Sequence, residues 1–208
     1  LAAHGIGRGD TVGLYLMNRA EHLEAFIAVV KLGAVPFNVN YRYRADELRY
    51  LFDNAQAAAI IHGAEYGDIM RQLRADLPML KLAVAVEDGS GISTEGSLPY
   101  ADLLTYQPAG PWARQEDDII LTYTGGTTGM PKGVMWPHKA FVFACAGGGG
   151  YFNPSGPLVE PSDIDDRARK GYPLKLFPVA PLMHAAALAN TGPALGDESR
   201  QRGSVEFV

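Results

Sequence analysis

Apolar runs and helical periodicity alternate along the first 86 residues of the chain. Short apolar runs bounded by polar or turn residues predict buried strands at 11–17, 35–39, 57–62 and 81–86. Between these runs, apolar residues recur at the i, i+3, i+4 and i+7 spacing of an amphipathic helix. Strands and helices that alternate with short links are typical of βαβ units. The pattern therefore predicts an α/β fold with mainly parallel sheets flanked by helices.

The helix predicted after the first strand has a recognisable start, inner face and end. Asn18 with Glu21 three residues later resembles a capping box, with Asn in the Ser/Thr position. Gly33 suits the C-terminal stop. The residues expected to face the core are Leu23, Phe26, Ile27 and Val30. A second helix is expected from Arg44 and a third over 65–76.

The pattern changes after the fourth strand. Residues 87–117 are rich in Gly, Ser, Pro and acidic residues, with a short helical piece at 100–106, which predicts a surface crossover between two lobes. The expected division is an α/β lobe at 1–86, the crossover at 87–117, a partial second lobe at 118–195 and a tail of different pattern at 196–208. The second lobe is expected to contain a strand at 118–124, a return strand at 134–136, a helix at 137–146, an irregular segment at 147–173 and a strand at 174–179.

Composition narrows the class of protein. A chain of 208 residues can bury a core as one domain or two small ones. The net charge of −5 disfavours a nucleic-acid partner. Cys145 is the single cysteine, so no internal disulfide forms, which fits a reducing cytoplasm. No apolar run reaches membrane-spanning length, so no transmembrane segment is expected; peripheral attachment to a membrane stays open.

The stretch 121–133, LTYTGGTTGMPKG, is the densest candidate for chemistry. Glycine lets a backbone turn tightly and approach a ligand, while threonine hydroxyls, free N–H groups and a lysine can hold phosphate oxygens. An ordinary Gly/Thr hairpin turn is the simpler alternative. The stretch is not the common P-loop, because Pro131 precedes Lys132 and Gly133 follows it.

This stretch resembles the phosphate-binding signature of adenylate-forming (acyl-activating, AMP-binding) enzymes. Leu121 and the segment 124–132 match the family pattern without a gap. The Lys-Leu-Gly-Ala turn at 31–34, the segment FNVNYRY at 37–43 and PLMH at 181–184 are similar to further elements of acyl-CoA synthetases, in the family's order. The likeness covers most of the chain and is strongest to fatty-acyl-CoA synthetases.

The resemblance implies a partial large N-terminal domain of the adenylate-forming fold and an ATP-dependent, AMP-forming acyl-CoA synthetase. It implies ATP and Mg²⁺ as cofactors, coenzyme A as co-substrate and a carboxylic acid, expected to be lipid-like, as substrate. The residues that would hold the ATP phosphates are Thr124, Gly125, Gly126, Thr127, Thr128, Gly129 and Lys132. The hydroxyls of Thr124 and Thr127 are expected to make direct contacts. A solvated surface lysine is the alternative for Lys132.

His184 of the PLMH element is the candidate catalytic residue, because the family histidine at this place lies beside the acyl carboxylate. A packed or helix-capping histidine is the alternative. His138, His184 and Cys145 lack a zinc spacing, so no protein metal site is expected. Packing is expected for Trp136 and His138. A solvated face is expected for Arg42 and Arg44.

Two features of the chain suggest a fragment. It begins with Leu1, and the tail 196–208 loses the preceding pattern. The resemblance places the adenine, ribose and magnesium elements and the catalytic lysine after PLMH, and none has a counterpart before Val208. The chain is therefore expected not to adenylate acids alone. A non-catalytic nucleotide-binding module, a pseudogene relic and an amino-acid adenylation domain are the competing hypotheses.

Overall fold

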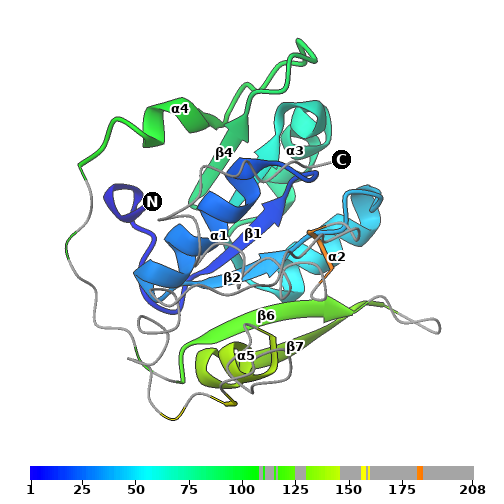
Figure 1. The fold of residues 1–208 in the computed structure, drawn as a ribbon. Coiled ribbons are helices and arrows are strands. Elements are labelled where there is room, and N and C mark those ends of the chain that lie inside the picture. The colour runs from blue at the N-terminus through cyan, green and yellow to red at the C-terminus, as the bar shows by residue number, and fades with distance from the viewer. Residues whose placement is uncertain are drawn as a thin grey trace.

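One mostly parallel sheet organises the part of the chain that the structure describes. The computed structural model describes residues 1–107, 110, 115, 117–124, 130–145, 156–157, 159 and 182–184. Within these ranges the chain forms a seven-stranded sheet of order β5-β4-β3-β1-β2-β6-β7 (Figure 1). The strands are β1 (Thr11–Tyr15), β2 (Val35–Asn38), β3 (Ala57–Gly63), β4 (Leu82–Val86), β5 (Leu98–Pro99), β6 (Ile119–Thr124) and β7 (Lys132–Pro137). All neighbouring pairs in this sheet are parallel except β6 with β7.

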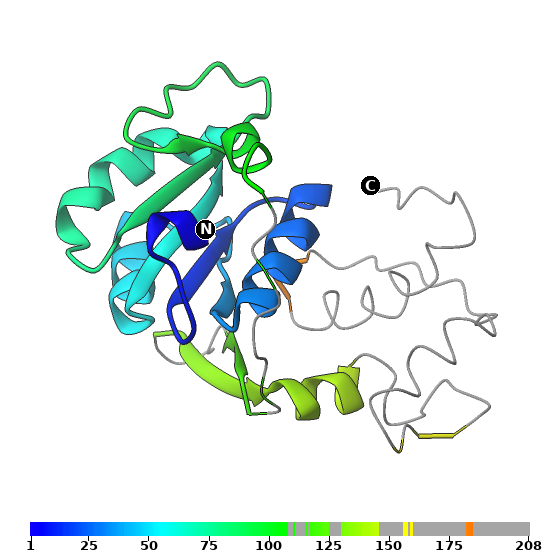
Figure 2. The same cartoon turned by 90° about the vertical axis from the view of Figure 1, so that its left-hand side faces the viewer.

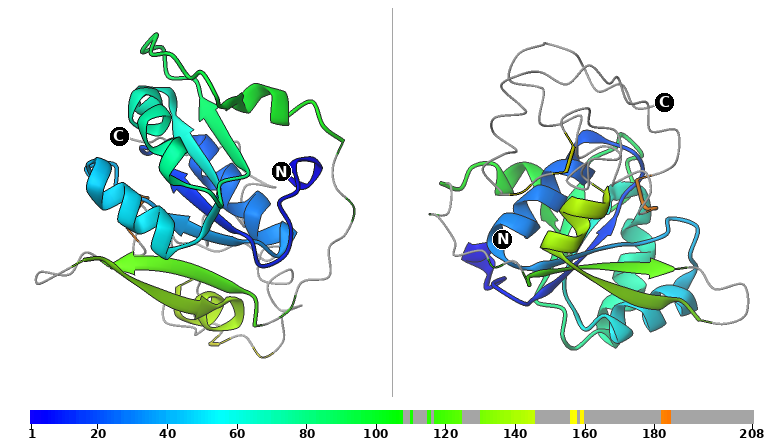
Figure 3. Two further views of the ribbon diagram at one scale, coloured as in Figure 1. Left: turned by 180° about the vertical axis from the view of Figure 1, so that it is seen from behind. Right: turned by 60° about the horizontal axis from the view of Figure 1, so that its bottom comes forward.

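The helices cover both faces of the sheet. They are α1 (Ala20–Leu32), α2 (Ala45–Asn54), α3 (Gly67–Leu73), α4 (Tyr100–Leu103) and α5 (His138–Cys145), with 3-10 turns η1 (Ala2–His4), η2 (Ala64–Tyr66) and η3 (Arg74–Asp76). Figure 2 shows α1 and α5 on one side of the sheet, and Figure 3 shows α2 and α3 in front of it when the molecule is seen from behind. The predicted α/β fold is confirmed.

Each face of the sheet has its own apolar core. Ala25, Val29 and Leu32 of α1 pack with one face of β1, β3 and β4. The other face packs against Leu48, Leu51 and Phe52 of α2 and against Met70 and Leu73 of α3. Because parallel strands in such a three-layer fold are buried on both faces, they read as continuous apolar runs rather than as alternating patterns.

The order of the strands makes one edge of the sheet suitable for binding a ligand. The chain runs from β1 to β2 on one side, and β3 then pairs with the opposite side of β1. Ligands of open α/β sheets bind beyond the carboxyl ends of the strands, where the order reverses. After β5 the chain returns to the far side of β2, where β6 pairs in parallel with Phe37 opposite Leu121. The carboxyl ends of β1, β2 and β6 therefore share one edge (Figure 1).

The predicted hairpin is present, with a longer return strand than expected. β6 and β7 pair from Ile119 opposite Pro137 to Thr124 opposite Lys132. Gly133 lies close beneath a neighbouring side chain of this hairpin, since a Cβ there would lie 2.8 Å from a methyl group of Leu121, which would have to shift. The side chain of Leu121 thus closes over the return strand.

Two local predictions for α1 are wrong. Arg19 occupies the N-cap position without a side-chain cap, so Asn18 and Glu21 form no capping box. Ile27 is exposed and Phe26 is only partly buried. The predicted stop is correct, since Gly33 has the left-handed φ of 71° that favours glycine.

Several predictions fall on parts of the chain outside the described residues. These are the irregular segment 147–173 for the most part, the strand at 174–179, and the tail at 196–208. The boundaries of the crossover at 87–117 and of the two lobes stay predictions.

Candidate functional site

β6 carries the first predicted phosphate ligand to the carboxyl edge of the sheet. Thr124 ends this strand three residues beyond the Leu121–Phe37 pair, and its side chain is exposed. The antiparallel pairing sets Lys132 directly opposite Thr124, also exposed. The structure therefore brings the two ends of the Gly/Thr loop together. Gly125, Gly126, Thr127, Thr128 and Gly129 lie outside the described residues.

The Thr124 hydroxyl is available to a ligand. Its one hydrogen bond within the described ranges is donated to the Lys132 carbonyl at 3.4 Å. This is longer than a normal O–H···O bond, so turning the hydroxyl toward a phosphate oxygen costs little. No ion pair to the Lys132 ammonium is found within the described ranges. An exposed ammonium beside a weakly bonded hydroxyl is suited to an anion.

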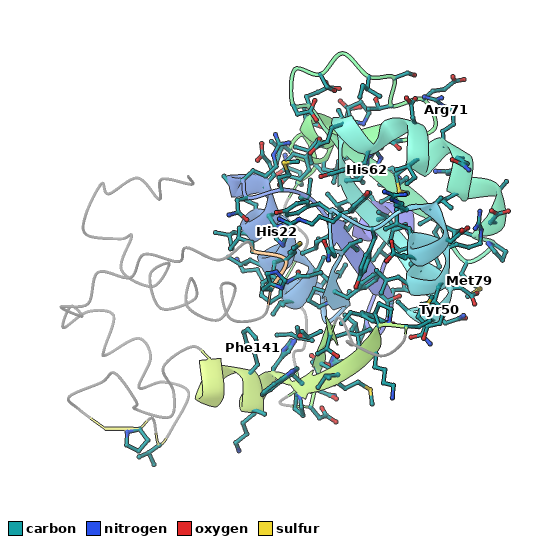
Figure 4. The ribbon with its side chains drawn as sticks, turned by 90° about the vertical axis from the view of Figure 1, so that its right-hand side faces the viewer. His22, Tyr50, His62, Arg71, Met79 and Phe141 are labelled. Carbon is teal, nitrogen blue, oxygen red and sulfur yellow. The ribbon has the colours of Figure 1, made fainter. Side chains whose placement is uncertain are left out.

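Helix α2 holds the base of this loop through two tyrosines. The Tyr123 hydroxyl donates to Asn54 Oδ1 at 2.7 Å, and the Tyr123 ring meets Phe37 edge-on at 5.9 Å between centroids. Burial, with nearby Tyr50, raises the pKa of Tyr123 to about 12, so this tyrosine is a neutral donor. Tyr50 of α2 (Figure 4) donates to the Pro131 carbonyl at 3.3 Å, next to the start of β7. The loop thus starts from a fixed base.

A second segment reaches the same edge from far along the chain. Leu182 is 1% exposed and packs with Leu23, Ile120 and Phe141. Its N–H donates to Asn18 Oδ1 at 2.7 Å, and its carbonyl accepts from Asn38 Nδ2 at 2.9 Å. Asn18 follows β1 and Asn38 ends β2, so the carboxyl edge itself holds this backbone. His184, two residues on, is exposed.

His22 supports Asn38 from inside α1. It is fully buried, and its Nε2 lies 3.4 Å from Asn38 Oδ1 (Figure 4). Burial lowers the pKa of His22, against a weaker opposing effect of its hydrogen bond to Asn38. A neutral imidazole has one N–H, and the amide oxygen of Asn38 requires a donor. This assigns the proton to Nε2.

Sequence reasoning missed Asn18, Asn38 and His22 as members of the site. Asn18 was interpreted as a helix cap, and its side chain instead binds Leu182. A signal was present, because Asn18 and Asn38 are polar residues at the carboxyl ends of two apolar strands. The partner in each case lies 144 or 164 residues away, so no local pattern could reveal it.

The remaining candidates are two arginines and Trp136. The Arg42 guanidinium lies 5.7 Å from the ring centroid of Tyr41 and is exposed. Arg44 is the N-cap of α2, where its N–H donates to Glu47. Trp136 packs against the cluster around Leu182, as expected.

The described ranges contain no group of three or more His, Cys, Asp or Glu residues placed to hold a metal ion. Magnesium is often held by one or two carboxylates together with substrate phosphates, so ATP chemistry does not require such a cage. None of the helices in the described ranges has the length and apolarity needed to cross a bilayer.

A parallel sheet with a Gly/Thr loop at its carboxyl edge defines a class of nucleotide-phosphate-binding α/β proteins. The chain belongs to the AMP-binding enzyme family, whose pattern matches residues 1–195. This confirms the resemblance based on the loop.

The relatives of the chain are CoA ligases. A medium/long-chain-fatty-acid–CoA/3-oxocholest-4-en-26-oate–CoA ligase of Mycolicibacterium smegmatis is 38% identical over 201 residues, covering 94% of this chain and 36% of the relative. A 3-oxocholest-4-en-26-oate–CoA ligase of Rhodococcus rhodochrous is 39% identical over 191 residues, covering 90% and 34%. The crystal structure of the anthranilate CoA ligase AuaEII in complex with anthranoyl-AMP superposes with a TM-score of 0.65 at 30% identity, over 73% of this chain and 29% of that one. The chain therefore spans about a third of the length of the curated relatives that it matches.

Proposed function

We propose that this chain supplies the phosphate-binding loop and part of the acid-binding site of an ATP-dependent, AMP-forming acyl-CoA ligase. The main support for this proposal is the register of the β6–β7 hairpin, which sets the hydroxyl of Thr124 opposite Lys132 at the carboxyl edge of the sheet. The second support is the segment at Leu182, which the ends of β1 and β2 hold at that same edge.

The chemistry explains why this loop is rich in donors. The acid carboxylate attacks the α-phosphorus of ATP, an acyl O–P bond forms, and the bond to pyrophosphate breaks. The thiol of CoA then attacks the acyl carbon and AMP leaves. Negative charge on the phosphates must be stabilised in the first step, which preorganised O–H and N–H donors and a lysine can do. Mg²⁺ bound to the ATP phosphates would add Lewis acidity.

The proposed roles follow from position. Lys132 and the hydroxyl of Thr124 contact phosphate oxygens at the base of the loop. The other loop donors proposed for the phosphates are Gly125, Gly126, Thr127, Thr128 and Gly129. His184 is proposed to lie beside the carboxylate of the acid.

A lipid-like acid is the proposed substrate. The M. smegmatis and R. rhodochrous relatives are named for fatty-acid or sterol-derived acids, which supports this class over small polar acids. We further propose that the protein acts in the cytoplasm, since its single cysteine, Cys145, allows no internal disulfide.

A segment exchange tests the function. Residues 1–195 replace the matching segment of the M. smegmatis ligase, and decanoate-dependent exchange between ATP and pyrophosphate is measured. We expect exchange that depends on the acid. The 208-residue chain alone is the control, and no exchange is expected from it. A folded hybrid that binds ATP without exchanging pyrophosphate would favour a non-catalytic module. Exchange with amino acids in place of decanoate would favour an amino-acid adenylation domain.

A further inference from the structure

The backbone of Leu182 is held by side chains through both of its polar groups. Asn18 accepts from its N–H at 2.7 Å, and Asn38 donates to its carbonyl at 2.9 Å. Both distances are those of well-formed hydrogen bonds. Two asparagines, of which one follows β1 and the other ends β2, therefore fix the position of one peptide segment at the edge of the sheet.

Each asparagine has a fixed direction of donation. A backbone N–H needs an acceptor and a carbonyl needs a donor, so Asn18 must present its oxygen and Asn38 its nitrogen. The Leu182 carbonyl sets the direction of the Asn38 amide, whose oxygen then lies 3.4 Å from Nε2 of the buried His22, at the distance of a weak hydrogen bond. The order of hydrogen bonds is thus His22 to Asn38 to the Leu182 carbonyl.

The side chain of Leu182 adds an apolar anchor to these bonds. It is 1% exposed and packs with Leu23 of α1, Ile120 of β6 and Phe141 of α5. The anchor prevents the segment from sliding, and the two hydrogen bonds set its orientation. His184 is two residues away and exposed, so its place at the edge follows from that of Leu182.

We propose that Asn18, Asn38 and His22 are positioning residues, which orient the segment 182–184 so that His184 faces the acid site. This inference rests on the proposed function, which gives His184 its place beside the acid carboxylate. The three residues are proposed to contact neither the acid nor ATP. They act through the backbone of Leu182.

The simpler explanation is that a buried peptide group merely needs partners. Both explanations predict that Leu182 loses protection when a partner is removed. Only positioning predicts that His184 responds in the same pattern, with an acceptor required at residue 18 and a donor required at residue 38.

The test compares isosteric substitutions in the 208-residue chain by nuclear magnetic resonance. Asn18→Asp keeps the acceptor for the Leu182 N–H, whereas Asn18→Ala removes it. Asn38→Asp keeps the acceptor for His22 but removes the donor to the Leu182 carbonyl. Asn40→Ala is the matched control, since Asn40 lies two residues from Asn38 and its side chain accepts from the Arg42 N–H instead.

Two signals are measured in each variant: hydrogen exchange of the Leu182 amide and the chemical shifts of the His184 ring at one pH. Asn18→Ala is expected to speed the exchange about tenfold, because the Leu182 amide loses the hydrogen bond that it donates. Asn18→Ala and Asn38→Asp are both expected to change the chemical shifts of the His184 ring. Asn18→Asp and Asn40→Ala should resemble the unchanged chain. Resonances of the core residues Tyr15 and Phe37 verify the fold, and Asn18, which is only half-buried, provides the variants least prone to unfold.

The possible outcomes distinguish the positioning role of Asn18, Asn38 and His22 from the proposed role of His184 in the acid site. The proposal is overturned if the His184 chemical shifts are unchanged in Asn18→Ala and Asn38→Asp, or if Asn18→Asp behaves as Asn18→Ala does. Decanoate is then added to the unchanged chain. A change in the His184 resonances supports the acid site. If the His184 resonances do not change with decanoate while the Asn18 and Asn38 variants behave as expected, the proposed role of His184 is contradicted. The positioning of segment 182–184 by Asn18 and Asn38 is then still supported.

Discussion

The strands β1 to β4 and the hairpin β6–β7 belong to one sheet but differ sharply in burial. Every residue of β3 and β4 is buried, whereas β7 is exposed at nearly every position. Met135 of β7 is 68% exposed, and Phe37 of β2 is 1% exposed. A rigid, doubly covered layer thus carries an open hairpin at its side, an arrangement in which a scaffold presents a binding loop.

The two halves of the candidate site follow the same contrast. The ends of the Gly/Thr loop, Thr124 and Lys132, are exposed and are brought together by backbone register. Leu182 is buried, and its backbone is held by the side chains of Asn18, which follows β1, and Asn38, which ends β2. We therefore expect substitutions in the scaffold to reduce the stability of the fold, and substitutions in the hairpin to reduce the rate of the reaction.

The largest expected effect is on stability in the scaffold. Phe37→Ala removes a ring that contacts Phe52 and Tyr123, and is expected to lower the free energy of unfolding by about 3–5 kcal/mol. Met135→Ala, on the exposed hairpin, should change it by less than about 0.5 kcal/mol. Urea unfolding of both variants measures the difference. Equal losses would contradict the division into scaffold and hairpin.

The next effect is on chemistry in the hairpin. In the exchanged ligase, Lys132→Ala is expected to slow acid-dependent pyrophosphate exchange about 100-fold, since a charge that stabilises the transition state is lost. The melting temperature should stay unchanged because the side chain is exposed. Lys31→Ala, at another exposed lysine, is the control. Unaltered turnover would remove Lys132 from the site.

The stability of another part of the scaffold, around Glu65, is expected to depend on pH, unlike that of the hairpin. Burial, with a hydrogen bond to Asp88, raises the pKa of Glu65 from 4.5 to about 7. The folded chain therefore binds more protons at this group than the unfolded chain between these values. Its stabilising contribution is complete below pH 4.5 and is lost as the pH rises through 7.

The matched variant is Glu65→Gln, whose amide mimics the protonated acid. Relative to the unchanged chain, it should gain stability as the pH rises from 5 to 7 and level off above that. Urea unfolding at pH 5, 6, 7 and 8 measures this difference. A difference that does not vary with pH would show that Glu65 is ionised throughout.

The smallest expected effect lies at the junction of scaffold and hairpin. Tyr50→Phe removes the 3.3 Å hydrogen bond to the Pro131 carbonyl, which is long and therefore weak. We expect the KM for ATP to rise about two- to threefold in the exchanged ligase, within the energy of one such bond. Tyr106→Phe, at an exposed tyrosine after α4, should leave it unchanged. A matching rise in that control would point to a general loss of stability.

The sequence predicted the scaffold well because buried parallel strands appear as continuous apolar runs. It misassigned the inner face of α1, where small residues such as Ala25 and Val29 are buried and the larger Ile27 is exposed. Hydrophobic periodicity gives most weight to large side chains, so a face formed by small ones is easily displaced.

The candidate site was predictable only where it is local in sequence. Thr124 and Lys132 belong to one motif, and the hairpin that joins them was expected. The bonds from Asn18 and Asn38 to Leu182 depend on how three distant segments meet in space. No spacing rule connects such residues, and only the fold reveals them.

The identity of the products tests the central claim most directly. Decanoate and ATP are supplied, without CoA, to the ligase that carries residues 1–195 of this chain, and the products are identified by mass spectrometry. The account predicts decanoyl-AMP and pyrophosphate in equal amounts. Formation of ADP and orthophosphate, with no acyl-adenylate, would contradict it.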